Sequence, residues 1–506
     1  MQNKRVSVLQ TRRQFIRQAA CAAVGTTALT STIRDLRFMN AAVAQTNVND
    51  YKALVCIFLA GGNDSNNLIV PTIQSEYNNY AAIRTSVLAL PLTSLQGNAN
   101  DLIRPVTSLN PDGHDYGFHP ACDLVTPTNG LVKLFNEGKL AVLFNTGTLI
   151  YPVTRAQYNA GLYKPPQLFS HADQVTQWQT SVPDQPPLTG WGGRCADLLA
   201  AVQPTAPISL SVSLSGANTF EVGNISSQYS VSTSGAISLS GVSGARLTAL
   251  TNILALPHPN MQAQAYSSVA KHSIDTGALL NSAILASSAS NFWTVPFPGT
   301  ITVPTGTGTS TFTSGLGSQL KMVARLIEAG SRSAANGGFG MKRQIFFCQV
   351  GGYDLHTGQA GTNPSTGSHA NLLAEISQCM FAFQRAMEQI GTLATHNDPD
   401  FAKRVTAFTS SDFGRTFPSN GLGSDHGWGS HHLIMGGAVK GQRTYGKFPT
   451  LAVNGPDDTN TGRWIPTTAC DQYFATLATW FGVDNSNLAT VFPNLGRFST
   501  SNLGFL

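Results

Sequence analysis

The sequence predicts an α/β fold with a mostly parallel central sheet flanked by helices. The first sign is a continuous apolar run, residues 53–60, of the kind found in strands covered on both faces. Residues 344–350 and 405–410 repeat this pattern. A long segment with helical periodicity lies between the second and third runs, as a crossover between parallel strands requires.

Each of these predicted strands ends at a loop that carries aspartate. The first is followed by Gly61-Gly62-Asn63-Asp64, the second by Gly351-Gly352-Tyr353-Asp354-Leu355-His356, and the third by Asp412. Because the carboxyl ends of parallel strands meet at one edge of a sheet, we expect these side chains to converge. A fourth apolar run, residues 140–144, ends at residues 145–148 and is expected to join the same sheet.

The predicted helices lie between these strands. One apolar stripe recurs at helical spacing, with Ser368 as a possible cap at its start and Gly391 at its end; its members are Leu373, Ile376, Met380, Phe383, Met387 and Ile390. Residues 131–135 and 472–481 are shorter segments of the same type.

The block at about 205–315 differs in composition from the rest. Residues 209–243 are rich in Ser, Thr and Gly and predict short β-hairpins, residues 261–287 predict a helix, and residues 296–317 read as a linker or long loop. We expect this β-containing block to be an insertion or cap within one α/β domain, residues 45–506. It would either shape access to the site or be surface elaboration.

The first 44 residues resemble a twin-arginine export signal. Arg12 and Arg13 are followed by a short, weakly apolar stretch and by Ala42-Val43-Ala44, which has the form of a signal-peptidase site. We expect residues 1–44 to be removed after export through the twin-arginine translocase, leaving a periplasmic or secreted protein. The apolar stretch is too short for a stable membrane anchor.

Removal of this segment changes the charge balance. The chain has 31 Lys and Arg against 26 Asp and Glu, and residues 1–44 hold seven of the former and one of the latter, so 24 and 25 remain. A nearly neutral mature protein gives no electrostatic reason to expect nucleic-acid binding. Six of the seven cysteines lie after residue 44 without a C-x-x-C pair, which argues against a zinc ribbon and leaves one to three disulfides open.

The aspartates and histidines of the strand-end loops suggest a metal site. Carboxylates combined with imidazoles suit Zn²⁺ or Mn²⁺, whereas carboxylates alone would suit Mg²⁺ or Ca²⁺. One or two ions are expected, and two ions sharing carboxylates would form a two-metal hydrolytic centre. An Asp after Gly also commonly caps a turn, which is the simpler role for Asp64. The predicted ligands are Asp64, Asp354, His356, Asp412, Asp425, His426 and His431.

Two further residues are candidates for catalysis. Arg415 lies where a guanidinium could hold a phosphate or sulfate, although a salt bridge to a neighbouring aspartate would explain it equally well. Ser170 precedes a predicted helix start, where an oxygen nucleophile would be near the positive end of the helix. The pattern Ser170-x-x-Asp173 is also an ordinary capping signature, and Ser65, Thr146 and Thr148 are rival nucleophiles.

These motifs in combination resemble a family of exported bacterial proteins, domain-of-unknown-function family 1501, over almost the whole mature chain. The matching segments include 59–64, 169–171, 351–356, 412–416, 425–427 and 435–437. The resemblance implies an alkaline phosphatase-like fold, shared with sulfatases, and a metal centre fed by strand-end loops. It also implies that Asp64 is the ligand after the first strand and that His431 or His432 supplies the last imidazole.

The chain departs from that superfamily's pattern at two places. One residue separates Asp354 from His356, where three are usual, and Phe413 follows Asp412 where histidine is usual. Either Asp425 and His426 take over this role, or one metal position is lost. The expected function is an exported metal-dependent hydrolase of small anionic phosphate or sulfate esters. The alternative is a non-catalytic exported protein that binds metal or assembles with a partner.

Overall fold

The computed structural model describes residues 48, 50–96, 102–103, 114–123, 130–186, 188–203, 206–237, 239–285, 292–305 and 308–506. The predicted signal peptide, residues 1–44, lies outside these ranges. Within them no helix combines the length and the apolar character needed to cross a membrane.

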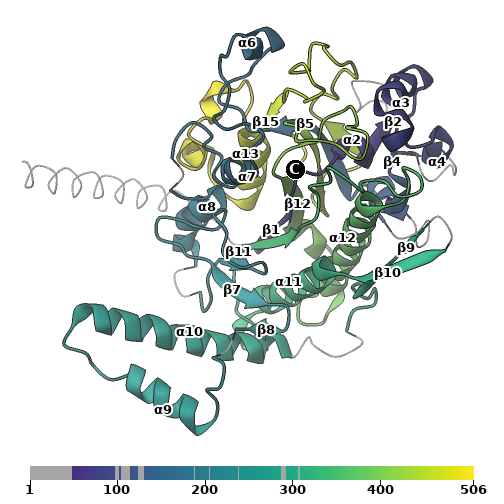
Figure 1. Ribbon diagram of the computed structural model, residues 1–506. Coiled ribbons are helices and arrows are strands. Elements are labelled where there is room, and N and C mark those ends of the chain that lie inside the picture. Colours follow the sequence, from purple (N-terminus) through teal and green to yellow (C-terminus); the bar gives the residue numbers. More distant parts are fainter. Residues whose placement is uncertain are drawn as a thin grey trace, which may run out of the picture.

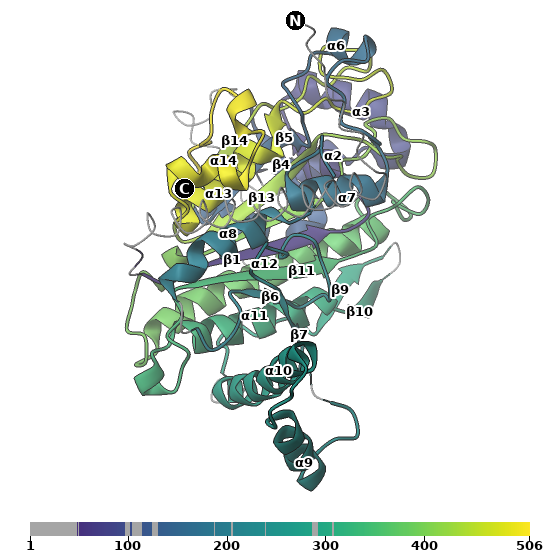
Figure 2. The ribbon, with the colours of Figure 1, turned by 90° about the vertical axis from the view of Figure 1, so that its left-hand side faces the viewer.

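The described residues form a mixed α/β protein with one large, mostly parallel sheet between helical layers (Figures 1 and 2). The strands are β1 (Lys52–Leu59), β2 (Ile69–Pro71), β3 (Leu102–Ile103), β4 (Tyr116–Phe118), β5 (Leu140–Gly147), β6 (Ser211–Ser213), β7 (Tyr229–Ser232), β8 (Gly235–Ala236), β9 (Thr300–Pro304), β10 (Thr309–Thr313), β11 (Arg343–Val350), β12 (Val405–Ser411), β13 (Ser430–Gly436), β14 (Arg443–Tyr445) and β15 (Thr468–Ala469). The helices are α2 (Ser65–Leu68), α3 (Gln74–Leu88), α4 (Leu92–Gln96), α5 (Leu131–Asn136), α6 (Arg155–Asn159), α7 (His171–Thr180), α8 (Trp191–Leu199), α9 (Ala245–Leu254), α10 (Met261–Leu285), α11 (Gly315–Ser331), α12 (Ser368–Thr392), α13 (Cys470–Phe481) and α14 (Leu488–Val491).

The main sheet has the strand order β14-β5-β13-β12-β1-β11-β6-β7-β8, and β15 pairs with β5. Strand β1 is central and parallel to both β11 and β12. Its last residue, Leu59, is in register with Val350 of β11 and with Ser411 of β12. The three strands therefore end at the same level, and the loops that follow them leave from one edge, as the sequence predicts.

Burial on both faces explains why β1 is a continuous apolar run. Ala53, Val55 and Ile57 join the core beneath α11 and α12, whereas the alternate side chains join a second core beneath α8 and α13. Successive side chains of a strand point to opposite faces, so a strand covered on both sides can be apolar at every position, as β1 is over residues 53–59. The predicted stripe of α12 is buried against the first of these cores.

Strand β13 corrects the sequence-based prediction for residues 430–436. His431 and His432 were expected in a strand-end loop, but both lie within this buried strand, which runs antiparallel between β12 and β5. The predicted linker at 296–317 is also wrong, because β9 and β10 pair there as an antiparallel hairpin and α11 begins at Gly315. The predicted helix at 261–287 is confirmed as α10.

Candidate metal centre

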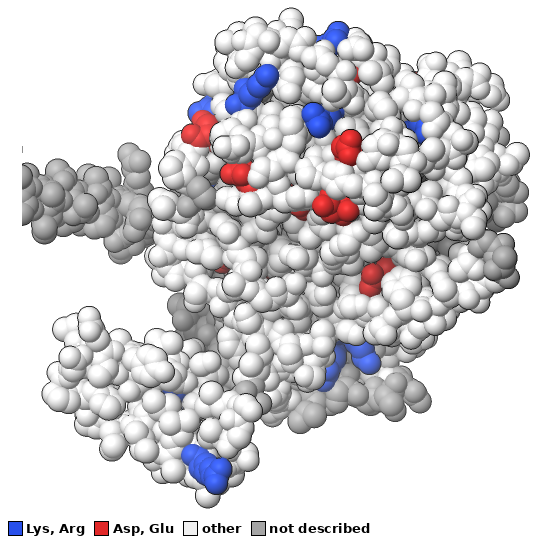
Figure 3. Space-filling model, viewed as in Figure 1, with Lys and Arg blue, Asp and Glu red and all other residues white. Residues whose placement is uncertain are grey.

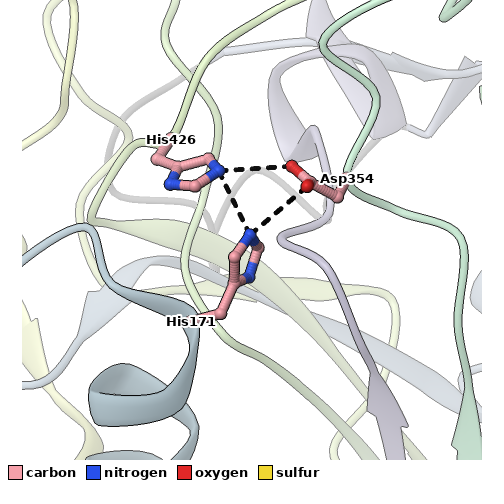
Figure 4. Close-up of side chains that lie close together, drawn as sticks. All are labelled: His171, Asp354 and His426. Atoms are coloured by element: carbon pink, nitrogen blue, oxygen red, sulfur yellow. Dashed lines mark hydrogen bonds and ion pairs between the residues drawn. The ribbon is translucent and has the colours of Figure 1, made fainter.

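Three side chains from distant parts of the chain face one another at the carboxyl edge of the sheet (Figure 4). His171 is the first residue of α7, Asp354 lies in the loop after β11, and His426 lies in the loop between β12 and β13. The Nε2 atoms of His171 and His426 are 3.1 Å apart. Asp354 places one oxygen 3.2 Å from His426 Nε2 and the other 3.5 Å from His171 Nε2.

His356 adds a fourth group to this cluster. Its Nε2 atom lies 2.9 Å from Nε2 of His426 and 3.1 Å from Oδ1 of Asp354. Ligands bound tetrahedrally at about 2.0–2.1 Å from a zinc ion are roughly 3.3 Å from one another. The separations among His171, Asp354 and His426 are of this size, so these three match the spacing of a metal-ligand set. His356 lies beside two of them, His426 and Asp354.

The outer nitrogen of each imidazole is held by an acceptor. His171 Nδ1 lies 2.6 Å from the carboxylate of Asp412, and His356 Nδ1 lies 2.9 Å from that of Asp425. His426 Nδ1 lies 2.8 Å from the backbone carbonyl of Phe169. A carbonyl can only accept, so Nδ1 of His426 carries the proton and a neutral ring turns the lone pair of Nε2 inward. Such outer contacts orient the histidine ligands of metal sites.

The charge state of the groups favours cation binding. Burial lowers the pKa of His426, and the charges of His171 and Arg415 add to this effect, so the ring is neutral at pH 7. Burial alone would raise the pKa of the Asp354 carboxyl, but Arg415 lowers it below its ordinary value. The lone pair of His426 Nε2 and the carboxylate of Asp354 then face the ring nitrogens of His171 and His356. They would repel one another unless protons or a cation lay between them.

Arg415 forms a salt bridge with Asp354, the simpler of the two roles that the sequence suggests. Its side chain is buried, and Nη1 donates to Asp354 at 2.8 Å and to the carbonyl of Gly61 at 3.2 Å. Nη2 donates to the carbonyl of Ser424. The guanidinium thus ties three loops together and fixes the carboxylate of Asp354, instead of facing outward toward a substrate anion.

Asp64 lies in a different setting from the one predicted. It is 2% exposed and forms an ion pair with Arg84 of α3, which is fully buried. Gln359 and Asn66 also donate to its carboxylate. Burial would raise its pKa, but Arg84 keeps the value below the ordinary one. Among the described residues, no hydrogen bond or ion pair joins Asp64 to the four-residue cluster.

His431 and Ser170 are likewise not brought into the cluster. His431 is buried in β13, where Nδ1 accepts the backbone N–H of Asn145 and the ring packs against Phe144 and Phe448. The hydroxyl of Ser170, which precedes α7, donates to Asp173. Ser170 occupies the N-cap position of α7, and its side chain makes no capping hydrogen bond there.

Of the predicted ligands, the structure brings together Asp354, His356 and His426, with Asp412 and Asp425 behind them. His171 was not among the predicted ligands, because Ser170-His171 reads as the start of a helix and no second ligand lies near it in sequence. Its side chain reaches the site because α7 begins beside the loop that contains Phe413, whose ring centroid is 4.8 Å from that of His171. The only hint of its role in the sequence was that residues 169–171 are among the segments that resemble the family.

The site is open to solvent, since the side chains of Asp354 and His356 are 45% and 42% exposed. Arg463 borders it: Nε donates to the carbonyl of His426 at 2.7 Å, and the guanidinium lies 4.2 Å from the ring centre of Phe169. Within the described residues Arg463 forms no ion pair with a carboxylate. It is therefore a cation at the rim whose charge is not neutralised by a neighbour.

The fold and the site define an α/β protein with a histidine-carboxylate cluster at the carboxyl edge of its sheet. The family model described as "Protein of unknown function (DUF1501)" matches residues 322–487. This stretch includes Asp354, His356, Asp412, Asp425 and His426, and it leaves out His171. No curated protein gives a significant match.

Proposed function

We propose that the protein is an exported, metal-dependent hydrolase of phosphate or sulfate esters with an alkaline phosphatase-like fold. The observation that carries the proposal is the close set of His171, His426 and Asp354, each held by an outer partner, with His356 beside them. Support for the fold assignment comes from the parallel strands whose loops supply these groups. The arginine pair near the N-terminus supports export.

We infer that one ion is bound by His171, His426 and Asp354, with His356 beside them. Imidazoles combined with one carboxylate suit Zn²⁺ or Mn²⁺ better than Mg²⁺ or Ca²⁺. A second ion would need further carboxylates. However, Asp412 already accepts from His171 and from the N–H of Gly61.

A divalent ion in this position supplies Lewis acidity, which lowers the pKa of water and polarises an ester oxygen. The chain's own residues supply orientation. Asp412, Asp425 and the carbonyl of Phe169 keep the three rings in one tautomer, and Arg415 keeps Asp354 ionised. Arg463 is the rim cation that would bind the negative phosphate or sulfate group.

Water is the favoured nucleophile. Within the described residues, the hydroxyls of Ser170, Thr146, Thr148 and Ser65 form no hydrogen bond with a histidine of the cluster. A serine needs such a base, or a lowered pKa, to attack an ester. We therefore expect Ser170→Ala to keep activity within a few-fold of the unchanged protein.

The test combines metal analysis with activity. Protein purified without chelator should contain about one equivalent of zinc or manganese and should hydrolyse an aryl phosphate or an aryl sulfate. His426→Gln should lose both properties, while His272→Gln, an exposed histidine of α10, should lose neither. Bound metal without turnover on either ester would support the metal-binding alternative. No binding of zinc or manganese after loading would reject the metal centre itself.

A further inference from the structure

Helices α9 and α10 form a hairpin, residues 245–285, that projects from the body of the molecule in both ribbon views (Figures 1 and 2). This hairpin is called the arm below. Its only charged residues are Arg246, Lys271 and Asp275, and the last two pair with each other at 2.6 Å. The arm is largely white in Figure 3. Its exposed apolar side chains are Ile253, Leu256, Met261, Tyr266, Val269 and Leu279, which are 45% to 86% exposed.

One face of α10 is buried at one end and bare at the other. The residues on this face recur at alternating steps of three and four positions, so they form a single stripe along the helix. They are Tyr266, Val269, Ser273, Thr276, Leu280 and Ala283. Thr276 and Leu280 are buried against the body at 5% and 0% exposure. Tyr266 and Val269, on the same stripe, are 74% and 70% exposed. Among the described residues, this continuation of the packing face beyond the body is left uncovered.

A groove of 530 Å³ lies where the bare part of this stripe leaves the body. Val269 and Thr276 of α10 form one side, and Ile208, Leu210 and Tyr229 lie on the other. None of the residues that line the groove is Lys, Arg, Asp or Glu. A surface that fills this groove should therefore be uncharged and largely apolar. The arm itself has such a surface.

We infer that a second copy of this chain covers the arm, with the two α10 helices packed antiparallel across a two-fold axis near Val269. In that arrangement the large Tyr266 of each copy faces the small Ser273 of the other, so the stripe complements itself, as a two-fold interface requires. Lys271 and Asp275 lie on the opposite side of the helix, so the contact buries no charge.

The exposed apolar area is at the lower limit for a stable contact. Tyr266 and Val269 of the stripe, together with the other four exposed apolar side chains of the arm, present on the order of 600 Å² per copy, or about 1,200 Å² for the pair, which is the low end of stable interfaces. A patch of that size is at the upper end of what monomers leave exposed. A lipid surface is the weaker candidate, because helices that lie on membranes carry Lys and Arg along their polar face and the arm has only Arg246 and Lys271.

Sedimentation equilibrium of the full chain from 1 to 100 µM tests the inference. We expect a dimer whose dissociation constant rises at least 100-fold in Val269→Asp, because two like charges would meet at the axis. The matched control is Leu188→Asp, at an 85% exposed leucine outside the arm, which should leave the dissociation constant unchanged. Since Val269 is itself 70% exposed, both variants should have the thermal midpoint of the unchanged chain when all three are measured at a concentration where the chain is monomeric.

A cross-link gives an independent readout. The six cysteines of the described part are buried, so Val269→Cys introduces an accessible thiol, and copper-phenanthroline should oxidise two copies to a disulfide-linked dimer. Leu188→Cys should form no disulfide-linked dimer under the same conditions. A chain that is monomeric at all concentrations and gives no Val269→Cys cross-link overturns the inference. If that monomer binds phosphatidylglycerol vesicles through the arm, the occupant is a lipid surface. Neither readout depends on metal or on ester hydrolysis.

Discussion

The ion pair between Asp64 and Arg84 allows a sharp test of what Asp64 does. Both side chains are almost fully buried, and Nη1 of Arg84 also donates to the carbonyls of Thr416 and Phe417. Asp64→Asn removes the carboxylate charge and leaves the guanidinium buried without a counter-ion. Breaking a buried pair in this way costs about 3–5 kcal/mol of folding free energy. We therefore expect a large loss of stability with the metal content of the folded protein unchanged.

Urea unfolding followed by tryptophan fluorescence measures the stability change, and elemental analysis measures bound metal. The matched control is Asp275→Asn, which breaks the exposed pair with Lys271 and should cost less than about 1 kcal/mol. Adding Arg84→Met to Asp64→Asn should recover part of the loss, because the uncompensated charge is then removed. The reasoning would be refuted by an Asp64→Asn variant that keeps full stability and loses its metal, since Asp64 would then be a ligand.

Three further predictions concern the site and the buried acids. Asp412→Asn should weaken zinc binding 10–100-fold, measured by competition with a chromogenic chelator, because the carboxylate orients His171; unchanged affinity would contradict that role. Arg463→Gln should raise the KM for an aryl phosphate about tenfold with little change in kcat, since a charge-assisted contact to the anion is lost. A fall in kcat with no change in KM would contradict the role of Arg463 in binding the substrate anion. Burial raises the pKa of Glu221 from 4.5 to about 8. Between these pH values the folded protein keeps a proton on Glu221 that the unfolded chain releases. The free energy of unfolding therefore falls as the pH rises toward 8. Glu221→Gln should remove this loss of stability, which is worth up to about 5 kcal/mol at pH 8 and little at pH 5. Urea titrations of both proteins at the two pH values measure it. An equal effect of the substitution on stability at pH 5 and at pH 8 would contradict the raised pKa.

The parts of the fold that follow from local pattern were predictable. Strand β1 has alternate side chains in two cores, so its uninterrupted apolar run indicates a central strand directly. The stripe of α12 has a helical period, and its predicted span differs from the observed one only at the ends. Strand β13 was missed because it contains two adjacent histidines after a glycine-rich loop, and histidines in that context resemble ligands. Their burial depends on β5 and β12, which lie far away in the sequence.

The site shows the same division between local and long-range information. Asp354, His356 and His426 follow strand ends, so their convergence follows from the parallel topology. The partner of Asp64 is Arg84, 20 residues later, and nothing between them marks that pairing, so a buried ion pair and a metal ligand look alike in the sequence. His171 reaches the cluster only because α7 begins beside the loop after β12, and that placement depends on the whole tertiary arrangement.

The antiparallel direction of β13 has a consequence for how the chemistry of this protein can change. Strands β12 and β13 are antiparallel neighbours, so the segment between them, residues 412–429, leaves and re-enters the sheet at the same edge. This segment is therefore anchored at both ends. Asp412, Arg415, Asp425 and His426 all belong to this one segment. Exchanging this segment as a unit would therefore replace His426 and the residues that position the other ligands, Asp412, Arg415 and Asp425, while the order of the strands stays the same.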